Sequence, residues 1–248
     1  MYGRDRVGGV GPLALVGSGE YTPAMLDVES GLIAGRPRRY VQIPTAASAE
    51  GPQRLRYWVE LGKAQAARIG VEPVPLEVAT REQAADPAIV KEIPGSGLIY
   101  LSGGSPVLLA GVLRDTPLWT AIVAEWRAGA ALAGCSAGAM AMATYVPELR
   151  HPVRGNQVGL GLLPHIRVLP HFDRMMGWVP DVLTRPFFRG DDGVHVVGVD
   201  EDTAIVSDPT DGDALPETFT VHGRQSAWLL SDGKRRQFPA GATLTLPR

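Results

Sequence analysis

Short apolar runs alternate with longer segments of helical pattern along the first two-thirds of the chain. The apolar runs are rich in Val, Leu, Ile and Tyr, which is typical of strands buried on both faces. The predicted strands are Leu13–Gly17, Tyr40–Ile43, Val71–Leu76 and Leu98–Leu101. The predicted helices between and after them are Pro52–Ile69, Pro106–Leu113 and Leu118–Arg127. Buried strands separated by helices indicate a parallel sheet covered by helices on both faces.

The pattern changes after about Val194, where short β-rich runs are separated by Gly, Asp and Pro. The runs are "VHVVGVDEDTAIVSD", "ETFTVHG", "SAWLLSDG" and "ATLTL". We expect them to form hairpins and edge strands that complete the same sheet. The chain shows no internal repeat, heptad run or low-complexity linker. The sequence therefore predicts one domain over residues 1–248, an α/β fold built as a three-layer α/β/α sandwich with a mostly parallel central sheet and β-hairpins near the C-terminus.

Composition narrows the classes of function. The 24 Lys and Arg residues nearly balance the 26 Asp and Glu residues, and no basic stripe is present, so nucleic-acid binding is not expected. The single cysteine, Cys135, cannot form an internal disulfide, which fits a reducing compartment. No apolar stretch approaches the roughly 18 residues of a membrane helix, and the N-terminus lacks the apolar core of a signal peptide. We expect a cytoplasmic protein with no membrane partner.

Neither a metal nor a cofactor is expected. One cysteine cannot build a structural zinc site, and the histidines show no H-x-x-x-H spacing. The Gly17-Ser18-Gly19 run follows a predicted strand, but the third glycine of a dinucleotide fingerprint would fall at Thr22. A tight turn that needs small residues explains this run better.

The best candidate for chemistry is Gly134–Gly138, "GCSAG", which satisfies the G-x-S-x-G pattern. In that pattern the serine lies on a sharp strand-to-helix turn and needs small neighbours. Ala130–Ala133 predicts the strand and Ala137–Thr144 predicts the helix. A tightly packed helix start is an equal alternative on the pentapeptide alone. Only the middle residue projects from such a turn, so Ser136 is the candidate nucleophile and Cys135 is expected to be a buried small hydrophobe.

A serine needs a base to take its proton and a carboxylate to orient that base. Between Ser136 and His171 there is one acidic residue, Glu148, so the order Ser136, Glu148, His171 offers a compact triad. His171 follows a strand-like run, where catalytic groups emerge from parallel sheets. An alternative is an α/β-hydrolase esterase, in which the late residues Asp208 and His222 would complete the triad.

Several motifs in the same order resemble the dipeptidase E and cyanophycinase family of serine peptidases. They are "YVQIPTAAS", "LIYLSGGS", "AGCSAGAMAM", "GLGLLP" followed by "PHFDR", and the late hairpin "VGVDEDTAIV". The resemblance implies a class I glutamine amidotransferase-like fold in which serine replaces the amidotransferase cysteine. It also implies Ser136 as nucleophile, His171 as general base and Glu148 as the acidic member, and it treats the late hairpin as structural.

The resemblance also implies the remaining site residues. A backbone N–H of the Gly103-Gly104 loop, at Gly104, would form an oxyanion hole with the N–H of Ala137. Gly103 and Ser105 would contact the substrate, and Arg174 is a candidate for binding a substrate carboxylate because arginine suits bidentate recognition. The expected reaction is hydrolysis of a small peptide or isopeptide through an acyl-enzyme. The resemblance also suggests a homodimer.

Departures from the family pattern lie around the expected pocket. Ser105-Pro106 follows the two glycines where relatives have a polar pair, and the apolar Met175–Trp178 follows the histidine where the cyanophycin-degrading branch has arginines. That branch has a polar residue before the histidine, whereas Pro170 in this chain looks more like the dipeptidase branch. These departures leave open whether the substrate is an aspartyl dipeptide or a β-linked peptide. They also leave open an alternative, in which the chain is a family member with a decayed pocket that acts as a ligand-binding protein.

Overall fold

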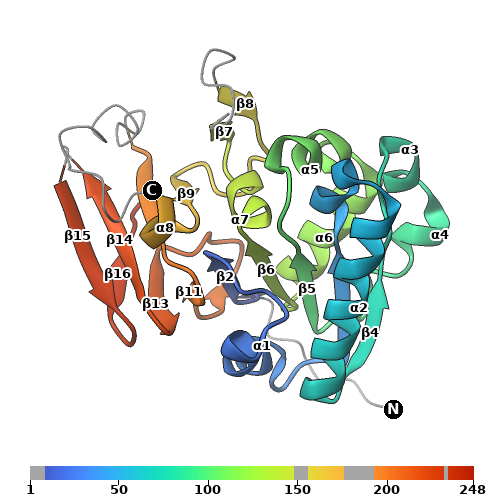
Figure 1. Ribbon diagram of the computed structural model, residues 1–248, viewed down its shortest axis with the longest axis horizontal. Helices are drawn as coiled ribbons and strands as arrows, with labels where there is room; N and C mark the ends of the chain where they lie inside the picture. Colours follow the sequence, from blue (N-terminus) through green and yellow to red (C-terminus); the bar gives the residue numbers. More distant parts are fainter. Residues whose placement is uncertain (1–8, 148–155, 176–192, 232–233) are drawn as a thin grey trace.

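The structure is a computed structural model that describes residues 9–147, 156–175, 193–231 and 234–248. An eight-stranded sheet lies at its centre, in the order β16-β13-β11-β2-β6-β5-β3-β4 (Figure 1). The strands from β2 to β4 in this order are parallel, and β11, β13 and β16 continue the sheet antiparallel beyond β2. Their bounds are β2 Leu13–Val16, β3 Arg39–Ile43, β4 Glu72–Pro75, β5 Leu98–Leu101, β6 Ala131–Cys135, β11 Thr203–Val206, β13 Thr218–Gly223 and β16 Thr243–Thr245.

Helices cover both faces of this sheet. Alternate side chains of the parallel strands belong to two separate buried clusters, one packed against α1 and α2 and the other against α5, α6 and α7. The helices are α1 Leu26–Ile33, α2 Pro52–Ile69, α3 Arg81–Ala84, α4 Pro87–Val90, α5 Pro106–Leu113, α6 Pro117–Arg127, α7 Ala137–Ala141 and α8 Phe172–Met175. The expected three-layer α/β/α sandwich with a mostly parallel central sheet is therefore confirmed.

A second sheet lies beside the first, and here the expectation for the C-terminal strands is corrected. Only some of the late strands complete the central sheet; the others form a four-stranded sheet in the order β15-β14-β10-β9, drawn at the left of Figure 1. Its strands are β9 Ile166–Leu169, β10 His195–Val199, β14 Ser226–Ser231 and β15 Lys234–Pro239. The hairpin pattern of each segment was evident, but the sheet that each strand joins depends on long-range pairing such as β9 with β10.

The remaining elements are short. Two strand pairs, β1 with β12 and β7 with β8, lie outside the two large sheets. Two 3-10 helices, η1 and η2, follow β2 and β3. The bounds are β1 Gly9–Val10, β7 Tyr145–Pro147, β8 Asn156–Val158, β12 Thr210–Asp211, η1 Pro23–Met25 and η2 Thr45–Glu50.

The helix after the serine is shorter than expected. The sequence predicts a helix over Ala137–Thr144, but α7 ends at Ala141. The carbonyl groups of Ala141, Ala143 and Thr144 accept hydrogen bonds from the N–H groups of residues 159–161. These carbonyls are therefore bonded across to a distant segment, and the chain turns into β7 instead of continuing the helix.

A carboxyl group is buried between α1 and the central sheet. The side chain of Glu29 accepts hydrogen bonds from the Tyr21 N–H at 3.4 Å and from the Tyr40 hydroxyl at 2.9 Å, and the residue is 1% exposed. Burial raises the pKa of Glu29 from 4.5 to about 7, against the opposing effect of these hydrogen bonds. Between these two pH values, Glu29 is protonated in the folded protein and ionised in the unfolded chain.

We expect this group to make the protein less stable as pH rises. Its contribution is most favourable below the unfolded pKa and is lost as pH rises through the folded value of about 7. The gap between the two pKa values corresponds to about 3 kcal/mol. Urea unfolding at pH values from about 4 to 8 should show the wild type losing about this much relative to Glu29→Gln, whose side chain does not titrate. If the free energies of unfolding of the two proteins changed with pH in parallel, the raised pKa of Glu29 would be contradicted.

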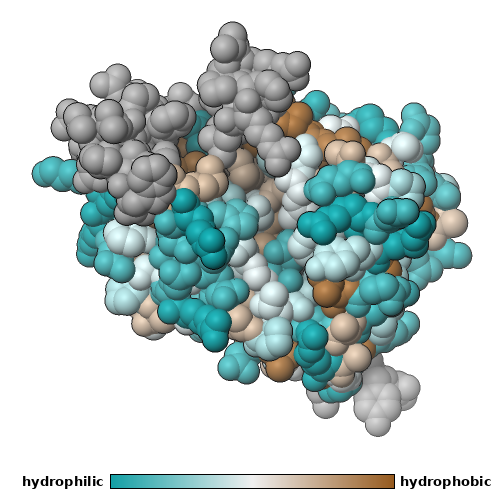
Figure 2. Space-filling view, viewed as in Figure 1, coloured by the Kyte–Doolittle hydropathy of each residue, from teal (hydrophilic) through white to brown (hydrophobic). Residues whose placement is uncertain are grey.

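Most of the face seen in Figure 2 is hydrophilic, and hydrophobic side chains appear on it in separate areas. In the described part of the chain, no single helix is long and apolar enough to cross a membrane. Helices α5 and α6 reach the necessary length and apolarity together, but they are bent by 95° at the break between them, and both contribute buried side chains to the core.

Candidate active site

Ser136 lies at the sharp turn between β6 and α7. Its φ and ψ angles of 48° and −105° are strained for a residue with a side chain. A Cβ atom at Gly134 would lie 2.6 Å from the carbonyl carbon of Gly138, and a Cβ atom at Gly138 would lie 2.2 Å from the carbonyl oxygen of Leu101. Neither position has room for a side chain, which gives the G-x-S-x-G pattern its physical reason here. The alternative of an ordinary packed helix start does not account for this strained serine.

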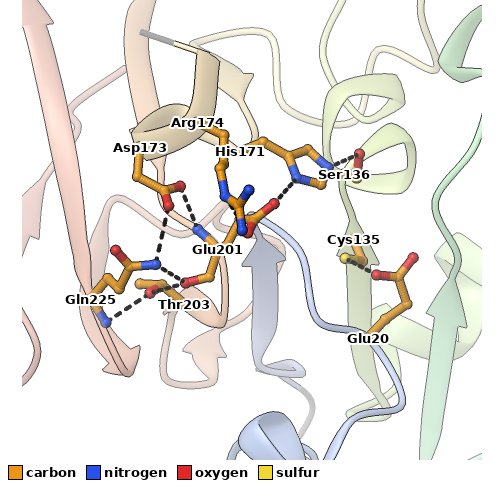
Figure 3. A network of polar contacts seen from close by, with 9 residues as sticks. All are labelled: Glu20, Cys135, Ser136, His171, Asp173, Arg174, Glu201, Thr203 and Gln225. Carbon is orange, nitrogen blue, oxygen red and sulfur yellow. Dashed lines mark hydrogen bonds and ion pairs between the residues drawn. The ribbon is translucent and has the colours of Figure 1, made fainter. Parts of the chain in front are cut away.

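The His171 ring contacts the serine from the neighbouring sheet. His171 lies between β9 and α8, with a positive φ of 49°, and its side chain is 34% exposed. Its Nε2 atom lies 3.2 Å from the Oγ atom of Ser136 (Figure 3). This distance allows the ring to accept the hydroxyl proton, as a general base must.

The other ring nitrogen faces Glu201. The Nδ1 atom of His171 lies 3.0 Å from Oε1 of Glu201, which occupies the turn between β10 and β11. Figure 3 shows the imidazole between the serine hydroxyl and this carboxylate. The sequence assigned the acidic position to Glu148, which lies outside the described residues. Glu201 itself belongs to the "VGVDEDTAIV" hairpin that the sequence analysis treated as structural.

Glu201 was missed because its proximity to the histidine is a long-range effect. Strands β9 and β10 pair in parallel with Leu169 opposite Gly198, so their carboxyl ends lie side by side. His171 is two residues beyond Leu169, and Glu201 is three residues beyond Gly198. The signal available in the sequence was an acidic turn directly after an apolar strand, which becomes informative only when the partner strand is known.

Neighbouring polar groups fix the turn that carries Glu201. The Glu201 N–H donates to Oδ1 of Asp173 at 2.9 Å, and the Gln225 amide donates to the Glu201 carbonyl at 2.9 Å and to Oδ2 of Asp173 at 3.3 Å. The Nε atom of Arg174 lies 3.1 Å from Oε2 of Glu201, although the arginine side chain is 75% exposed. The structure therefore places Arg174, expected to bind substrate, in an ion pair with the carboxylate behind the histidine (Figure 3).

The Gly103-Gly104 loop follows β5 and lies against the serine turn. A Cβ atom at Gly103 would lie 3.5 Å from the Cβ atom of Ser136, and one at Gly104 would lie 2.3 Å from the carbonyl oxygen of Ala46. Gly104 also has a φ of 137°, which side chains rarely tolerate. The hydroxyl of Ser105 accepts a hydrogen bond from the Leu108 N–H at 3.3 Å, so it caps α5.

Cys135 and Ala137 flank the serine and are both buried. The Cys135 thiol donates a hydrogen bond to Oε2 of Glu20 at 2.8 Å. Burial, together with the nearby Glu20 carboxylate, raises the pKa of the Cys135 thiol well above its usual value. A protonated, buried thiol is a poor nucleophile, in agreement with the expectation that Cys135 has a packing role.

The residues of the alternative esterase triad lie elsewhere. Asp208 and His222 line a surface hollow together with Asp27 and Arg36, beside α1. His171 is the histidine in contact with Ser136. Among the described residues, no group of three or more His, Cys, Asp or Glu side chains is arranged to hold a metal ion.

A parallel-sheet sandwich that presents a strained serine to a histidine backed by a carboxylate has the arrangement typical of serine hydrolases. The family model of "Peptidase family S51" matches residues 13–214. The chain belongs to this family, and its resemblance to the dipeptidase E and cyanophycinase group is confirmed.

Curated relatives and solved structures agree with this family. The chain is 30% identical over 194 residues to a cyanophycinase of Nostoc sp. (strain PCC 7120 / SAG 25.82 / UTEX 2576), covering 70% of this chain and 59% of that protein. It is 27% identical over 183 residues to a cyanophycinase of Geminocystis herdmanii (strain PCC 6308), covering 61% of this chain and 62% of that protein. The chain thus spans about three-fifths of the length of these curated relatives.

One solved structure is similar over nearly the whole chain. A peptidase from an acI-B1 actinobacterium is 37% identical, with a TM-score of 0.86, over 96% of this chain and 98% of that one. A putative peptidase E protein from Listeria monocytogenes EGD-e is 19% identical, with a TM-score of 0.61, over 87% of this chain and 99% of that one. The second likeness is one of fold alone.

Proposed function

We propose that this protein is a serine peptidase that hydrolyses an amide bond of a small peptide or isopeptide through an acyl-enzyme. One observation carries the proposal: the His171 ring lies within hydrogen-bonding distance of both the Ser136 hydroxyl, at 3.2 Å, and the Glu201 carboxylate, at 3.0 Å. Membership of a peptidase family supports the same chemistry.

In the proposed first step, Ser136 attacks the carbonyl carbon of the substrate while Nε2 of His171 takes the hydroxyl proton. The imidazolium then gives this proton to the leaving amine as the C–N bond breaks, and the acyl group stays on the serine oxygen. A water molecule attacks the ester in the second step. His171 takes one proton from that water and returns it to Ser136, which releases the acid product.

We propose Glu201, in place of Glu148, as the carboxylate that orients His171. A hydrogen bond from Nδ1–H to Oε1 would hold the tautomer whose Nε2 lone pair faces the serine. It would also stabilise the imidazolium formed during each proton transfer. The hydrogen bond that the Glu201 N–H donates to Asp173, and the one that the Gln225 amide donates to the Glu201 carbonyl, support a fixed position for this carboxylate.

The developing negative charge on the substrate oxygen needs donors close to Ser136. We propose the backbone N–H groups of Gly104 and Ala137 for this role, each contributing about 3–4 kcal/mol of transition-state stabilisation. The contact of the Gly103-Gly104 loop with the serine turn supports the pairing. Arg174 could bind a substrate carboxylate only by sharing its guanidinium with Glu201.

Labelling with a fluorophosphonate probe tests the proposal without knowledge of the substrate. We expect one adduct, which peptide mass mapping places on Ser136, and we expect it to be lost in His171→Ala. Cys135→Ser is the matched control and should be labelled like the wild type, because its hydroxyl keeps a donor for Glu20 while the thiol is removed.

Two outcomes would contradict the proposal. Absence of labelling in well-folded wild-type protein would favour the ligand-binding alternative. An adduct on Cys135 would instead overturn the choice of nucleophile.

A further inference from the structure

The buried carboxylate of Glu20 is hydrogen-bonded to both segments that carry the proposed oxyanion-hole donors. Glu20 lies in the loop after β2 and is 7% exposed. Its Oε1 atom accepts a hydrogen bond from the Gly103 N–H at 2.9 Å, and its Oε2 atom accepts one from the Cys135 thiol at 2.8 Å. Figure 3 shows Glu20 below Cys135, on the side of the serine turn away from the His171 ring.

Each partner of Glu20 immediately precedes part of the chemical machinery. Gly103 precedes Gly104, whose N–H is one proposed donor. Cys135 precedes Ser136 and is two residues before Ala137, which provides the other donor. The two oxygens of one carboxylate therefore link the Gly103-Gly104 loop to the Ser136 turn.

The local geometry leaves little freedom for this arrangement. A Cβ atom at Gly103 would lie 2.6 Å from Oε1 of Glu20 and 3.5 Å from the Cβ atom of Ser136, so Gly103 is held between the carboxylate and the nucleophile. A bond from its N–H to Glu20 sets the orientation of the peptide group before Gly103. The next peptide group, which carries the Gly104 N–H, is joined to this one only through the φ and ψ torsions of Gly103.

The loop that carries Glu20 is itself fixed from the other side of the site. A Cβ atom at Gly17 would lie 2.1 Å from the carbonyl oxygen of Asp200, and one at Gly19 would lie 2.3 Å from Oδ1 of Asp202. Because Gly17 and Gly19 have no side chains, this loop can pass directly against the turn that bears Glu201.

We infer that Glu20 is a positioning residue, which holds the Gly103-Gly104 loop and the Ser136 turn at the spacing that stabilises the oxyanion. The inference rests on the proposed function. Glu20 does not touch the reacting atoms and acts through Gly103 and Cys135. Its role is thus in the rate of the chemical step and not in substrate binding.

The experiment compares Glu20→Ala, Glu20→Gln and the matched control Glu29→Gln, with a fluorophosphonate probe as the reactant. Glu29 is also a buried carboxylate, but it accepts its hydrogen bonds from the Tyr21 N–H and the Tyr40 hydroxyl and not from Gly103 or Cys135. We expect Glu20→Ala to lower the maximal rate of Ser136 labelling about 100-fold while the probe concentration at half-maximal rate changes less than about threefold. Glu20→Gln should recover most of the rate, because its amide oxygen can accept the Gly103 N–H.

Hydrogen exchange provides a readout that does not depend on turnover. The Gly103 amide should exchange faster in Glu20→Ala than in the wild type, and it should be unchanged in Glu29→Gln. A wild-type labelling rate in Glu20→Ala, or an equal loss of rate in Glu29→Gln, would overturn the inference. If Glu20→Ala does not fold, the test rests on Glu20→Gln. A loss of labelling rate in Glu20→Gln as large as the loss in His171→Ala would also overturn the inference. Failure of the wild type to label would instead contradict the proposed function, while the exchange measurement would still report on Glu20.

Discussion

Replacing Ser136 with alanine should lower peptide hydrolysis by about 10⁴- to 10⁶-fold, because the attacking oxygen is removed and the remaining groups can only bind and polarise the substrate. Replacing His171 with alanine should cost about as much, since the serine hydroxyl then has no base at 3.2 Å to take its proton. The double variant should be no slower than either single variant, because the two residues act as one unit.

The measurement is release of free amine from a panel of aspartyl dipeptides and β-linked dipeptides, with folding checked by circular dichroism. Cys135→Ser serves as the control, since it changes the residue before Ser136 and keeps a donor for Glu20 without removing a proposed reacting group. Strictly additive losses in the double variant would show that Ser136 and His171 act independently. Turnover by Ser136→Ala at the wild-type rate would rule out an acyl-enzyme at this residue.

Replacing Glu201 with glutamine should lower kcat by about 10³- to 10⁴-fold, while the same change at Glu148 should have an effect of less than about threefold. The amide has almost the same shape as the carboxylate but bears no charge, and its NH₂ group can favour the wrong imidazole tautomer. The loss therefore separates the orienting role of the carboxylate from simple packing.

The pair of variants distinguishes the two assignments of the acid. Both are measured with the same dipeptide panel, and kcat and KM are separated because the orienting group acts on proton transfer. A large loss in Glu148→Gln with full activity in Glu201→Gln would restore the assignment made from the sequence. Replacing Asp173 with asparagine should give a smaller loss of kcat, since it weakens the hydrogen bond from the Glu201 N–H and leaves the Glu201 carboxylate unchanged.

Much of the central sandwich could be predicted from local patterns. The buried runs around Leu13–Val16 and Leu98–Leu101 lack polar residues because both faces of these strands are covered by helices. The strand beginning near Val71 was also predicted, and its prolines fit the observed position of β4 at the sheet edge. The serine turn could be predicted because steric crowding requires glycine on each side of it.

The sequence by itself determined the alternation of strands and helices, the sharp turn at Ser136 and the segment that carries His171, because these features depend on neighbours within a few residues. The second sheet, the contact of Glu201 with His171 and the bridge made by Glu20 were decided only by the tertiary structure. Glu20 is 83 residues from Gly103 and 115 from Cys135, and Glu201 is 30 residues from His171. Hydrogen bonds over such separations depend on which strands pair, and the hydrophobic pattern of a strand specifies its burial without specifying its partner.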